Sequence, residues 1–351
     1  MKNEIAVSII INNYNYDRFL AQAIDSALAQ LYLNLEVIVV DDGSTDRSRD
    51  IIASYGDRIL AILQENGKQG AAFNNGFAHS RGEIVVFLDS DDYLFPNAIE
   101  QIVQVWQPNL AKVHYRLEVV DADQQNLGYS LPQGSQPLSQ GEVWGDLVAR
   151  GGYVSTPTSG NALNRQALQQ IFPIPDAYKL TADDYLSMLI PFYGKVSSIE
   201  TPLGAYRIHG SNQWALSTVS PERFRRFVRH DLQNYDLLVN KATELGHEVP
   251  IDLEQRSIGR LWPRITSLRL DPLNHPVPGD RTLTLMQQGI RCLWAYSNFN
   301  WQKRSIYTLW FLWVGIMPPV LAKPAISWLY TPHNRPKIVS WTITRLRAMI
   351  G

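Results

Sequence analysis

Cysteine is almost absent from this chain of 351 residues, which contains only Cys292. A single thiol excludes an internal disulfide framework and a cysteine-rich metal site, and it suits a reducing compartment. Net charge is also lacking, because 32 Lys and Arg residues face 33 Asp and Glu residues. This balance gives no sign of a nucleic-acid partner. The N-terminus lacks a signal-peptide layout, so we expect a cytoplasmic protein.

Glycine-rich phosphate loops are missing as well. No G-x-G-x-x-G motif follows the first predicted strand, and no G-x-x-x-x-G-K-[ST] motif occurs in the chain. These motifs hold phosphates on backbone N–H groups. If the chain binds phosphates, it must hold them with a metal ion and side chains instead.

Short apolar runs rich in β-branched residues alternate with helical patterns in the first hundred residues. Such alternation predicts a parallel sheet with right-handed crossovers and helices on its faces. The length of the chain allows a domain of ~200–250 residues plus an extension. The predicted strands cover residues 5–11, 36–40, 59–63 and 83–88.

Polar loops follow three of these strands, at Asn12–Tyr16, Asp41–Asp46 and Asp89–Asp92. Ligands of open α/β sheets bind at the carboxyl ends of the strands, so we expect the functional residues to lie at one edge of the sheet. Three carboxylates within four residues repel one another unless a cation lies among them, and Mg²⁺ or Mn²⁺ prefers such oxygen ligands. A solvated acidic turn is the alternative. Asp42 is placed to accept from a base or ribose hydroxyl, or to serve as a turn residue.

The segments that carry these loops are SIIINNYNYDRFLAQAIDSALAQ, EVIVVDDGSTD and ENGKQGAAFNNGFAHSRGEIVVFLDSDDYLFP. Together they resemble the nucleotide-binding half of family 2 glycosyltransferases, which have the GT-A fold. The resemblance implies a Rossmann-like, mostly parallel sheet, an inverting transfer from a nucleotide sugar and a Mn²⁺ or Mg²⁺ cofactor. Uracil is the expected base, with guanine and thymine open. The family's Pro-Thr-Tyr-Asn-type sequence is replaced here by residues 12–15, Asn-Asn-Tyr-Asn.

The resemblance also implies roles for individual residues. Tyr14 and Asp42 should contact the base, Lys68 the base or phosphates, and Asp89 the ribose. Asp91 should bind the metal that bridges the diphosphate, with Asp89 beside it. The implied donor site consists of Asn12, Tyr14, Asp42, Lys68, Asp89, Ser90 and Gly160, the last lying in a small-residue turn at 156–162 beneath the donor sugar.

A second acid pair, Asp183-Asp184, follows Thr181. Thr181 is a good N-cap and acids favour a first helical turn, so capping is one interpretation. The other follows from the resemblance, because the family carries a Glu-Asp pair here whose second member is the general base. Asp184 is then the base and Asp183 its helper. A Tyr-Arg-x-His segment ends at His209, which could bind the metal, contact the diphosphate or be structural.

The resemblance ends near Asn212. We therefore predict a catalytic domain at 1–215, with a nucleotide-binding half at 1–110 and an acceptor half at 111–215, and a helical extension at 216–351. Residues 121–141 are expected to form an exposed loop. Ser220-Pro221 should open a long helix that stops at Gly246. Trp214 could stack on a sugar or belong to the core.

Acidic residues are entirely missing from 281–351, where Trp, Tyr, Lys and Arg are frequent. Ser305 to Ala322 carries no charge, but Pro318-Pro319 interrupts it, so a straight membrane-spanning helix is not expected. Basic flanks and aromatic boundaries favour an interfacial segment on an anionic membrane surface. The alternative is a helical pair that packs on the catalytic domain.

The sequence thus predicts a glycosyltransferase that moves a sugar from a nucleotide donor to a hydroxyl of a saccharide or lipid-linked acceptor. The resemblance implies a place in cell-surface polysaccharide, lipid-linked oligosaccharide or glycolipid synthesis, on the cytoplasmic face of the inner membrane. Two alternatives stay open at this point. One is a sugar-nucleotide nucleotidyltransferase, and the other is a non-catalytic, membrane-associated binding protein of the same fold.

Overall fold

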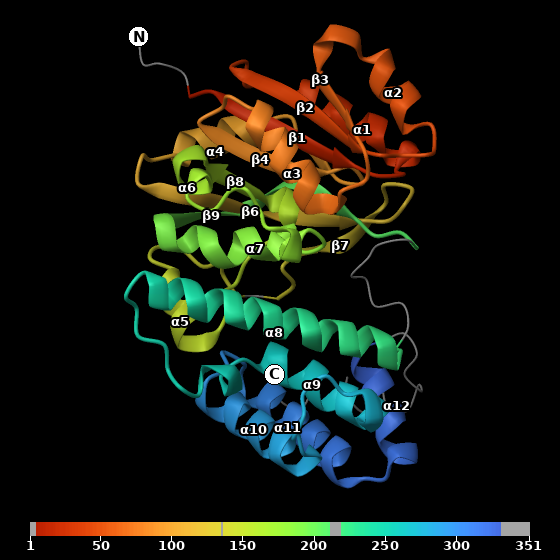
Figure 1. Ribbon diagram of the computed structural model, residues 1–351, viewed down its shortest axis with the longest axis vertical. Helices are drawn as coiled ribbons and strands as arrows, with labels where there is room; N and C mark the ends of the chain where they lie inside the picture. The colour runs from red at the N-terminus through yellow and green to blue at the C-terminus, as the bar shows by residue number, and fades with distance from the viewer. Residues whose placement is uncertain (1–4, 135, 211–218, 331–351) are drawn as a thin grey trace. The chain divides into compact units, whose positions relative to one another are not determined.

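The chain folds into two compact units (Figure 1). The computed structural model describes residues 5–134, 136–210 and 219–330. The first unit comprises residues 1–145 and 153–211, and the second comprises 146–152 and 212–351. The predicted boundary at residue 215, with Asn212 and Trp214, lies outside the described residues, so the domain limits stay a prediction.

One mixed sheet of nine described strands forms the centre of the first unit, in the order β3-β2-β1-β4-β8-β6-β9-β5, with β7 paired to β6. The four N-terminal strands of the main path are parallel neighbours, as the sequence predicts. β8 is antiparallel to both β4 and β6. The strands are β1 Val7–Asn13, β2 Leu35–Asp42, β3 Leu60–Gln64, β4 Ile84–Asp89, β5 Tyr93–Leu94, β6 Leu110–Val120, β7 Asn126–Leu131, β8 Asn161–Asn164 and β9 Lys195–Arg207.

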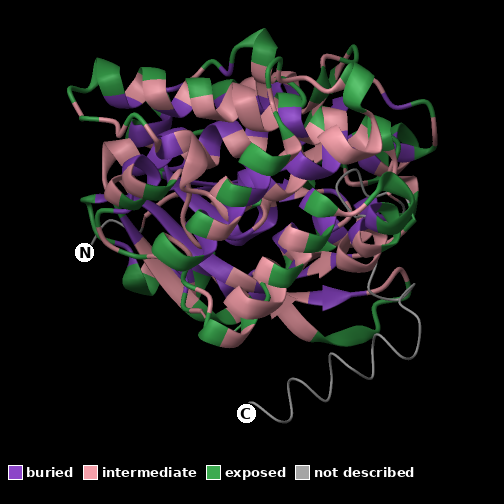
Figure 2. Cartoon of the chain, turned by 90° about the horizontal axis from the view of Figure 1, so that it is seen from below, coloured by how far each residue is buried: buried purple, intermediate pink, exposed green. Residues whose placement is uncertain are grey.

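Helices cover both faces of the parallel part of this sheet. Ile9 of β1 packs in one core cluster with Ile24 of α1 and Ile99 of α4. On the opposite face, α3 approaches so closely that a Cβ on Gly76 would lie 2.4 Å from the Ile10 side chain. A strand buried on both faces needs an unbroken apolar run, which is what β1, β2 and β4 carry. Most residues of these strands are buried, and Figure 2 shows buried residues in purple through the interior of the chain. The helices of this unit are α1 Asp17–Leu28, α2 Ser48–Ser54, α3 Lys68–His79, α4 Ala98–Val105, α6 Arg165–Gln169 and α7 Ala182–Leu189.

One local prediction is wrong, and the structure does not support one of the two interpretations of Thr181. Residues 121–141 are not only loop, because β7 lies within them and pairs antiparallel with β6. β7 has one neighbour and an exposed first half, so it lacks the buried alternation by which a strand is recognised. Thr181 occupies the N-cap position of α7, but its hydroxyl makes no capping hydrogen bond and is buried without a partner in the described part of the chain.

The second unit is helical, as predicted. Its helices pack around buried side chains that include Leu261, Phe311 and Ile326. Ser220 caps the long helix by accepting from the Arg223 N–H, and the helix ends before Gly246. The helices are α8 Pro221–Glu244, α9 Ile258–Leu270, α10 Thr282–Ala295, α11 Trp301–Ile316 and α12 Pro319–Tyr330, with most of α5 Trp144–Arg150 in the same unit.

The uncharged stretch 305–322 is divided between α11 and α12, because the helix ends at Ile316 and restarts at Pro319. Phe311 and Val314 are buried in the core of the unit, whereas Leu309 is 65% exposed. Within the ranges that the structure describes, we find no helix with the length and apolarity needed to cross a bilayer. The stretch therefore has one face in the core and one face open.

Candidate active site

The carboxyl ends of β1, β2 and β4 meet at one edge of the sheet, as their polar loops predict. Asn12 pairs in register with Asp89, and Asn13 with Asp41. The Asn12 side-chain amide donates to Asp89 Oδ1 at 3.1 Å. Asn12 Oδ1 is buried and accepts no hydrogen bond from the described residues. This edge therefore offers a bound ligand an acceptor that the described residues leave unused.

Asp42 organises the loop that leads into α3. Its buried carboxylate accepts from the Gln64 side chain at 2.8 Å and from the N–H groups of Gly67 at 2.7 Å and Lys68 at 2.8 Å. Lys68 has a φ of +72°, and its ammonium nitrogen lies 5.9 Å from the centre of the Tyr14 ring. Tyr14 is 45% exposed. Tyr14 and Lys68 thus form an open platform, and Asp42 holds the backbone beneath it.

Three carboxylates lie at the end of β4 and in the turn after it, at Asp89, Asp91 and Asp92. Ser90 in this turn is buried. Burial and the charge of Asp91 raise the pKa of Asp89 to about 6, against hydrogen bonds from Asn12 and two other side chains. Burial and the charges of Asp91 and Asp89 raise the pKa of Asp92 well above its usual value. Charging all three groups together is costly, and a cation beside them would lower that cost.

Asp92 forms hydrogen bonds to two segments that are distant in the sequence. Its Oδ1 accepts from the Arg207 N–H at 2.9 Å, and its Oδ2 accepts from the Ser159 hydroxyl at 2.6 Å. The Arg207 guanidinium in turn donates to the Asp91 carbonyl at 2.7 Å and lies 4.6 Å from the centre of the Phe19 ring. Asp92 and Arg207 therefore hold the backbone at Asp91, from which its side chain extends.

His209 lies beside Asp91. Its Nε2 is 2.9 Å from Asp91 Oδ2, and its ring contacts Phe19 and Tyr16 with centroid distances of 5.0 and 5.5 Å. The structure thus brings these two predicted metal-site residues together. Among the described residues, no three His, Cys, Asp or Glu side chains gather as a metal cage. A single carboxylate such as Asp91 still suits Mg²⁺, which binds one or two carboxylates plus substrate phosphates.

The turn at 156–161 connects this acidic turn to the second acid pair. The Ser159 hydroxyl accepts from the Asp89 N–H at 3.1 Å. The Asn161 amide donates to the Pro157 carbonyl at 2.6 Å, which closes the turn. At Gly160 a Cβ would lie 2.8 Å from the Tyr115 carbonyl oxygen. Any larger residue at position 160 would push the turn off the sheet.

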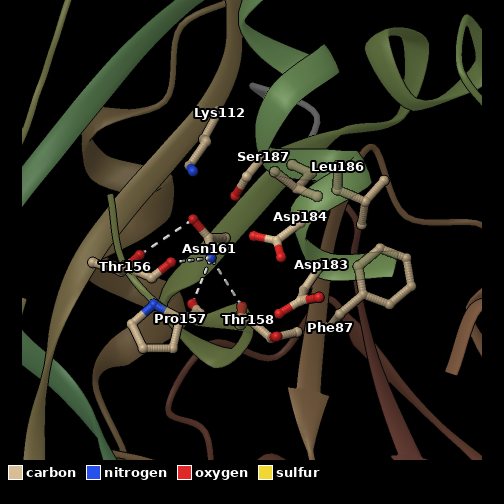
Figure 3. A pocket seen from close by; sticks show the side chains of 11 residues that line it. Phe87, Lys112, Thr156, Pro157, Thr158, Asn161, Asp183, Asp184, Leu186 and Ser187 are labelled. Carbon is tan, nitrogen blue, oxygen red and sulfur yellow. Dashed lines mark hydrogen bonds between the residues drawn. The ribbon is translucent and has the colours of Figure 1, made fainter. Parts of the chain in front are cut away.

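A cavity of about 120 Å³ opens behind this turn (Figure 3). Asp183 and Asp184 reach it from the first turn of α7, and Thr158 and Asn161 reach it from the turn at 156–161. Phe87 of β4 and Lys112 of β6 also line the cavity. The structure therefore brings the second acid pair to the same turn whose Ser159 contacts Asp89 and Asp92.

Sequence reasoning missed three residues of this region. Asp92 has no separate role among the three acids of its turn, Arg207 has none within the Tyr-Arg-x-His segment, and no motif of the sequence includes Lys112. The signal for Lys112 is Lys112-x-His114-x-Arg116, three basic residues at alternating positions of a strand that is otherwise buried. Such a strand rarely carries charge without a reason.

Comparison with known proteins agrees with the resemblance seen in the sequence. The model of the family Glycosyl transferase family 2 matches residues 8–141. An uncharacterized glycosyltransferase of Nostoc sp. strain PCC 7120 is 36% identical over 260 residues, which cover 71% of this chain and 79% of that protein. The chain belongs to glycosyltransferase family 2. An uncharacterized glycosyltransferase of Rickettsia typhi is 48% identical over 99 residues, but these cover only 28% of this chain and 31% of that relative.

Solved structures support the GT-A fold of this family 2 glycosyltransferase. S. aureus TarS 1-349, in complex with UDP-GlcNAc, aligns with a TM-score of 0.56 and 15% identity over 93% of this chain and 91% of that one. The mannosyltransferase PcManGT of Pyrobaculum calidifontis, in complex with GDP-Man and Mn²⁺, gives a TM-score of 0.51 and 16% identity over 97% and 84%. The fold and the enzyme class predicted from the sequence are therefore confirmed.

Proposed function

We propose that this glycosyltransferase moves a sugar from a nucleoside diphosphate donor to an acceptor hydroxyl with inversion, using Asp184 as general base. The observation that carries the proposal is the turn at 156–161. Ser159 in this turn contacts Asp89 and Asp92, while Thr158 and Asn161 line the cavity that holds Asp184. A single rigid turn thus lies between the groups suited to the diphosphate and the group suited to the acceptor.

Asn12, Tyr14, Asp42, Lys68, Asp89, Ser90 and Gly160 form the proposed donor site. The Tyr14 ring would stack on the base, and the Lys68 ammonium would lie near the base or the phosphates. Asn12 Oδ1 would accept from a donor hydroxyl. TarS bound to UDP-GlcNAc and PcManGT bound to GDP-Man support a nucleotide-sugar donor. We favour UDP among the nucleotides.

Asp91 and His209 would hold a divalent metal, with Asp89 next to them. The Mn²⁺ of PcManGT supports this choice. The pKa of Asp89, which burial and the neighbouring charge of Asp91 raise, is in keeping with it. When bound, Mn²⁺ or Mg²⁺ would neutralise the charge that develops on the departing diphosphate. Arg207 and His209 position the Asp91 side chain for this ligand set.

Asp184 would accept the proton of the acceptor hydroxyl as its oxygen forms a bond to the anomeric carbon. The bond from that carbon to the diphosphate oxygen breaks in the same step, so the configuration inverts. A base must lie within hydrogen-bond reach of the proton that it takes. Asp183, the preceding residue, lines the same cavity and would orient the acceptor.

The donor site is tested by calorimetric titration of UDP, GDP and dTDP, with and without Mn²⁺. We expect one nucleotide to bind in a metal-dependent manner. Asp91→Ala removes a proposed metal ligand and should therefore weaken that binding more than about tenfold. A tenfold loss corresponds to ~1.4 kcal/mol. Asp50→Ala, at an exposed aspartate of α2, is the control. Absence of binding for all three nucleotides would contradict the proposed function.

The alternatives left open by the sequence are not supported by the comparisons. A nucleotidyltransferase would belong to another family, and the relatives are glycosyltransferases. The acceptor is proposed to be a saccharide or lipid-linked hydroxyl compound, in cell-surface polysaccharide, lipid-linked oligosaccharide or glycolipid synthesis. The family association supports this class.

We also propose that the second unit binds the anionic cytoplasmic face of the inner membrane. Its α11 and α12 expose apolar side chains at Leu309 (65%), Trp313 (45%), Ile316 (60%) and Val320 (80%). Leu309, Trp313 and Ile316 follow a spacing of four and three, so they lie on one face of α11. The lack of acids after residue 280 suits an anionic leaflet. Arg335, Lys337, Arg345 and Arg347 of that stretch lie outside the described residues.

Sedimentation with phosphatidylglycerol vesicles tests the membrane proposal. The wild type should sediment at low salt and less at high salt, because screening weakens the attraction of the basic side chains. The double variant Leu309→Ser/Ile316→Ser should lose tenfold or more in partition, on the order of 1.4 kcal/mol. Leu31→Ser/Leu33→Ser, at residues that are 63% and 88% exposed in the first unit, is the matched control. Equal losses in both double variants, or no sedimentation of the wild type, would refute this proposal.

A further inference from the structure

Lys112 is a buried cation inside the cavity that holds the proposed base. It lies on β6, is 1% exposed, and lines the cavity together with Asp183 and Asp184. Its ammonium nitrogen points into the cavity on the side of Asn161 and Ser187 (Figure 3). The proposed donor and acceptor chemistry assigns no task to this group.

The contacts of Lys112 are all uncharged. Its Nζ donates to the Tyr153 hydroxyl at 3.0 Å and to the Ser155 hydroxyl at 2.8 Å, and it lies 5.2 Å from the centre of the Tyr153 ring. Among the residues that the structure describes, no carboxylate forms an ion pair with it. An ammonium group has three N–H donors, so one donor is left for the cavity.

The next two basic residues on the same face of β6 are His114 and Arg116, and neither is a buried charge without an ion pair. Arg116 forms an ion pair with Glu200 at 2.7 Å. Burial and the charge of Lys112 lower the pKa of His114 to about 3, so this ring is neutral, and its Nε2 donates to the Ser139 carbonyl at 2.7 Å. Arg116 is thus paired and His114 is uncharged. Lys112 is the buried member of this set for which the described residues form no ion pair.

A buried charge is costly unless an opposite charge or a metal compensates it. Here the cavity itself is divided by charge, because Asp183 and Asp184 enter from α7 while the ammonium enters from β6. A ligand that places a hydroxyl at Asp184 and an anion at Lys112 would match both ends. The volume of about 120 Å³ admits a group of a few atoms.

We propose that Lys112 is a specificity-determining residue that binds the carboxylate of an acidic sugar held against Asp184. The inference rests on the proposed function and names its substrate class. A carboxylate is favoured over a phosphate, because a phosphate carries about −1.5 to −2 charges and would be repelled more strongly by Asp183 and Asp184. The acidic sugar can be the transferred residue of the donor or the end of the acceptor.

Paired ligands that differ only in the carboxylate test the proposal. The donor arm titrates UDP-glucuronate and UDP-glucose, or GDP-mannuronate and GDP-mannose if GDP is the nucleotide that binds. The acceptor arm titrates methyl glucuronide and methyl glucoside against the nucleotide-saturated enzyme. In one arm the wild type should bind the acidic member at least about tenfold more tightly, the range for a charge-assisted hydrogen bond. The arm that shows the preference identifies the source of the acidic sugar.

Lys112→Met should abolish this preference and leave the affinity for the free nucleoside diphosphate unchanged. Lys195→Met, at an exposed lysine of β9, is the matched control and should keep the preference. A purely structural Lys112 would lower the affinity for both members of a pair equally and leave their ratio unchanged. If Lys112→Met does not fold, a wild-type enzyme that shows no acidic preference in either arm still overturns the assignment.

Two failures are distinguishable. Wild-type enzyme that binds no nucleoside diphosphate contradicts the proposed function itself. Wild-type enzyme that binds the nucleotide but shows no acidic preference in either arm, or a preference that survives in Lys112→Met, overturns only the assignment of Lys112.

Discussion

Replacing Asp184 by asparagine should abolish sugar transfer and leave donor binding intact. The amide has almost the same shape as the carboxylate but cannot take a proton from the acceptor hydroxyl. A positioned general base contributes roughly 10²- to 10⁴-fold to a rate, so we expect the turnover of Asp184→Asn to fall by that factor. Its calorimetric affinity for the nucleotide should stay within about twofold of wild type, because a twofold change is a small free energy.

Two further variants separate the base from general disturbance of the fold. Asp57→Asn, at an exposed aspartate, should transfer sugar at the wild-type rate. Asp183→Asn should lose less activity than Asp184→Asn, because Asp183 is proposed to orient the acceptor and not to take its proton. Undiminished transfer by Asp184→Asn would remove the base assignment, and a larger loss in Asp183→Asn would move that role to Asp183.

The parallel half of the fold could be predicted because its strands are marked locally. β1, β2 and β4 are unbroken apolar runs, since both of their faces are buried. The polar residues that end these runs then had to meet at one edge, and Asn12 and Asp89 do pair there. The hydrophobic pattern of a strand and the position of its polar end are properties of short segments, so they can be predicted from a single sequence.

The contacts that hold the site together are not local, and for that reason they could not be predicted. Asp92 accepts from Ser159, 67 residues away, and from Arg207, 115 residues away. Nothing in the spacing of these residues indicates which of the three acids in the turn makes these contacts. The capping interpretation of Thr181 is not supported for a related reason. Its hydroxyl is buried by tertiary packing and does not reach the N-terminal N–H groups of α7.

Asp92→Ala should strongly destabilise the first unit. It leaves the buried Ser159 hydroxyl and the Arg207 N–H without the acceptor that they share. An unsatisfied buried donor costs roughly 1–3 kcal/mol, and less repulsion with Asp89 and Asp91 returns part of that cost. We expect a net loss of about 2–4 kcal/mol, which lowers the melting temperature by about 5–10 °C for a unit of this size.

The amide variant makes the prediction specific. In Asp92→Asn the side-chain oxygen can still accept from the Arg207 N–H, and the Ser159 hydroxyl can turn to accept from the new amide. Calorimetric melting should therefore place Asp92→Asn between wild type and Asp92→Ala, with the exposed control Asp57→Ala at the wild-type value. Sugar transfer should follow the same order, since Ser159 belongs to the turn between the proposed metal site and Asp184. If Asp92→Ala has the melting temperature of the wild type, the prediction is wrong. The turn at 156–161 is then held by its own hydrogen bonds, and Asp92 has a different role.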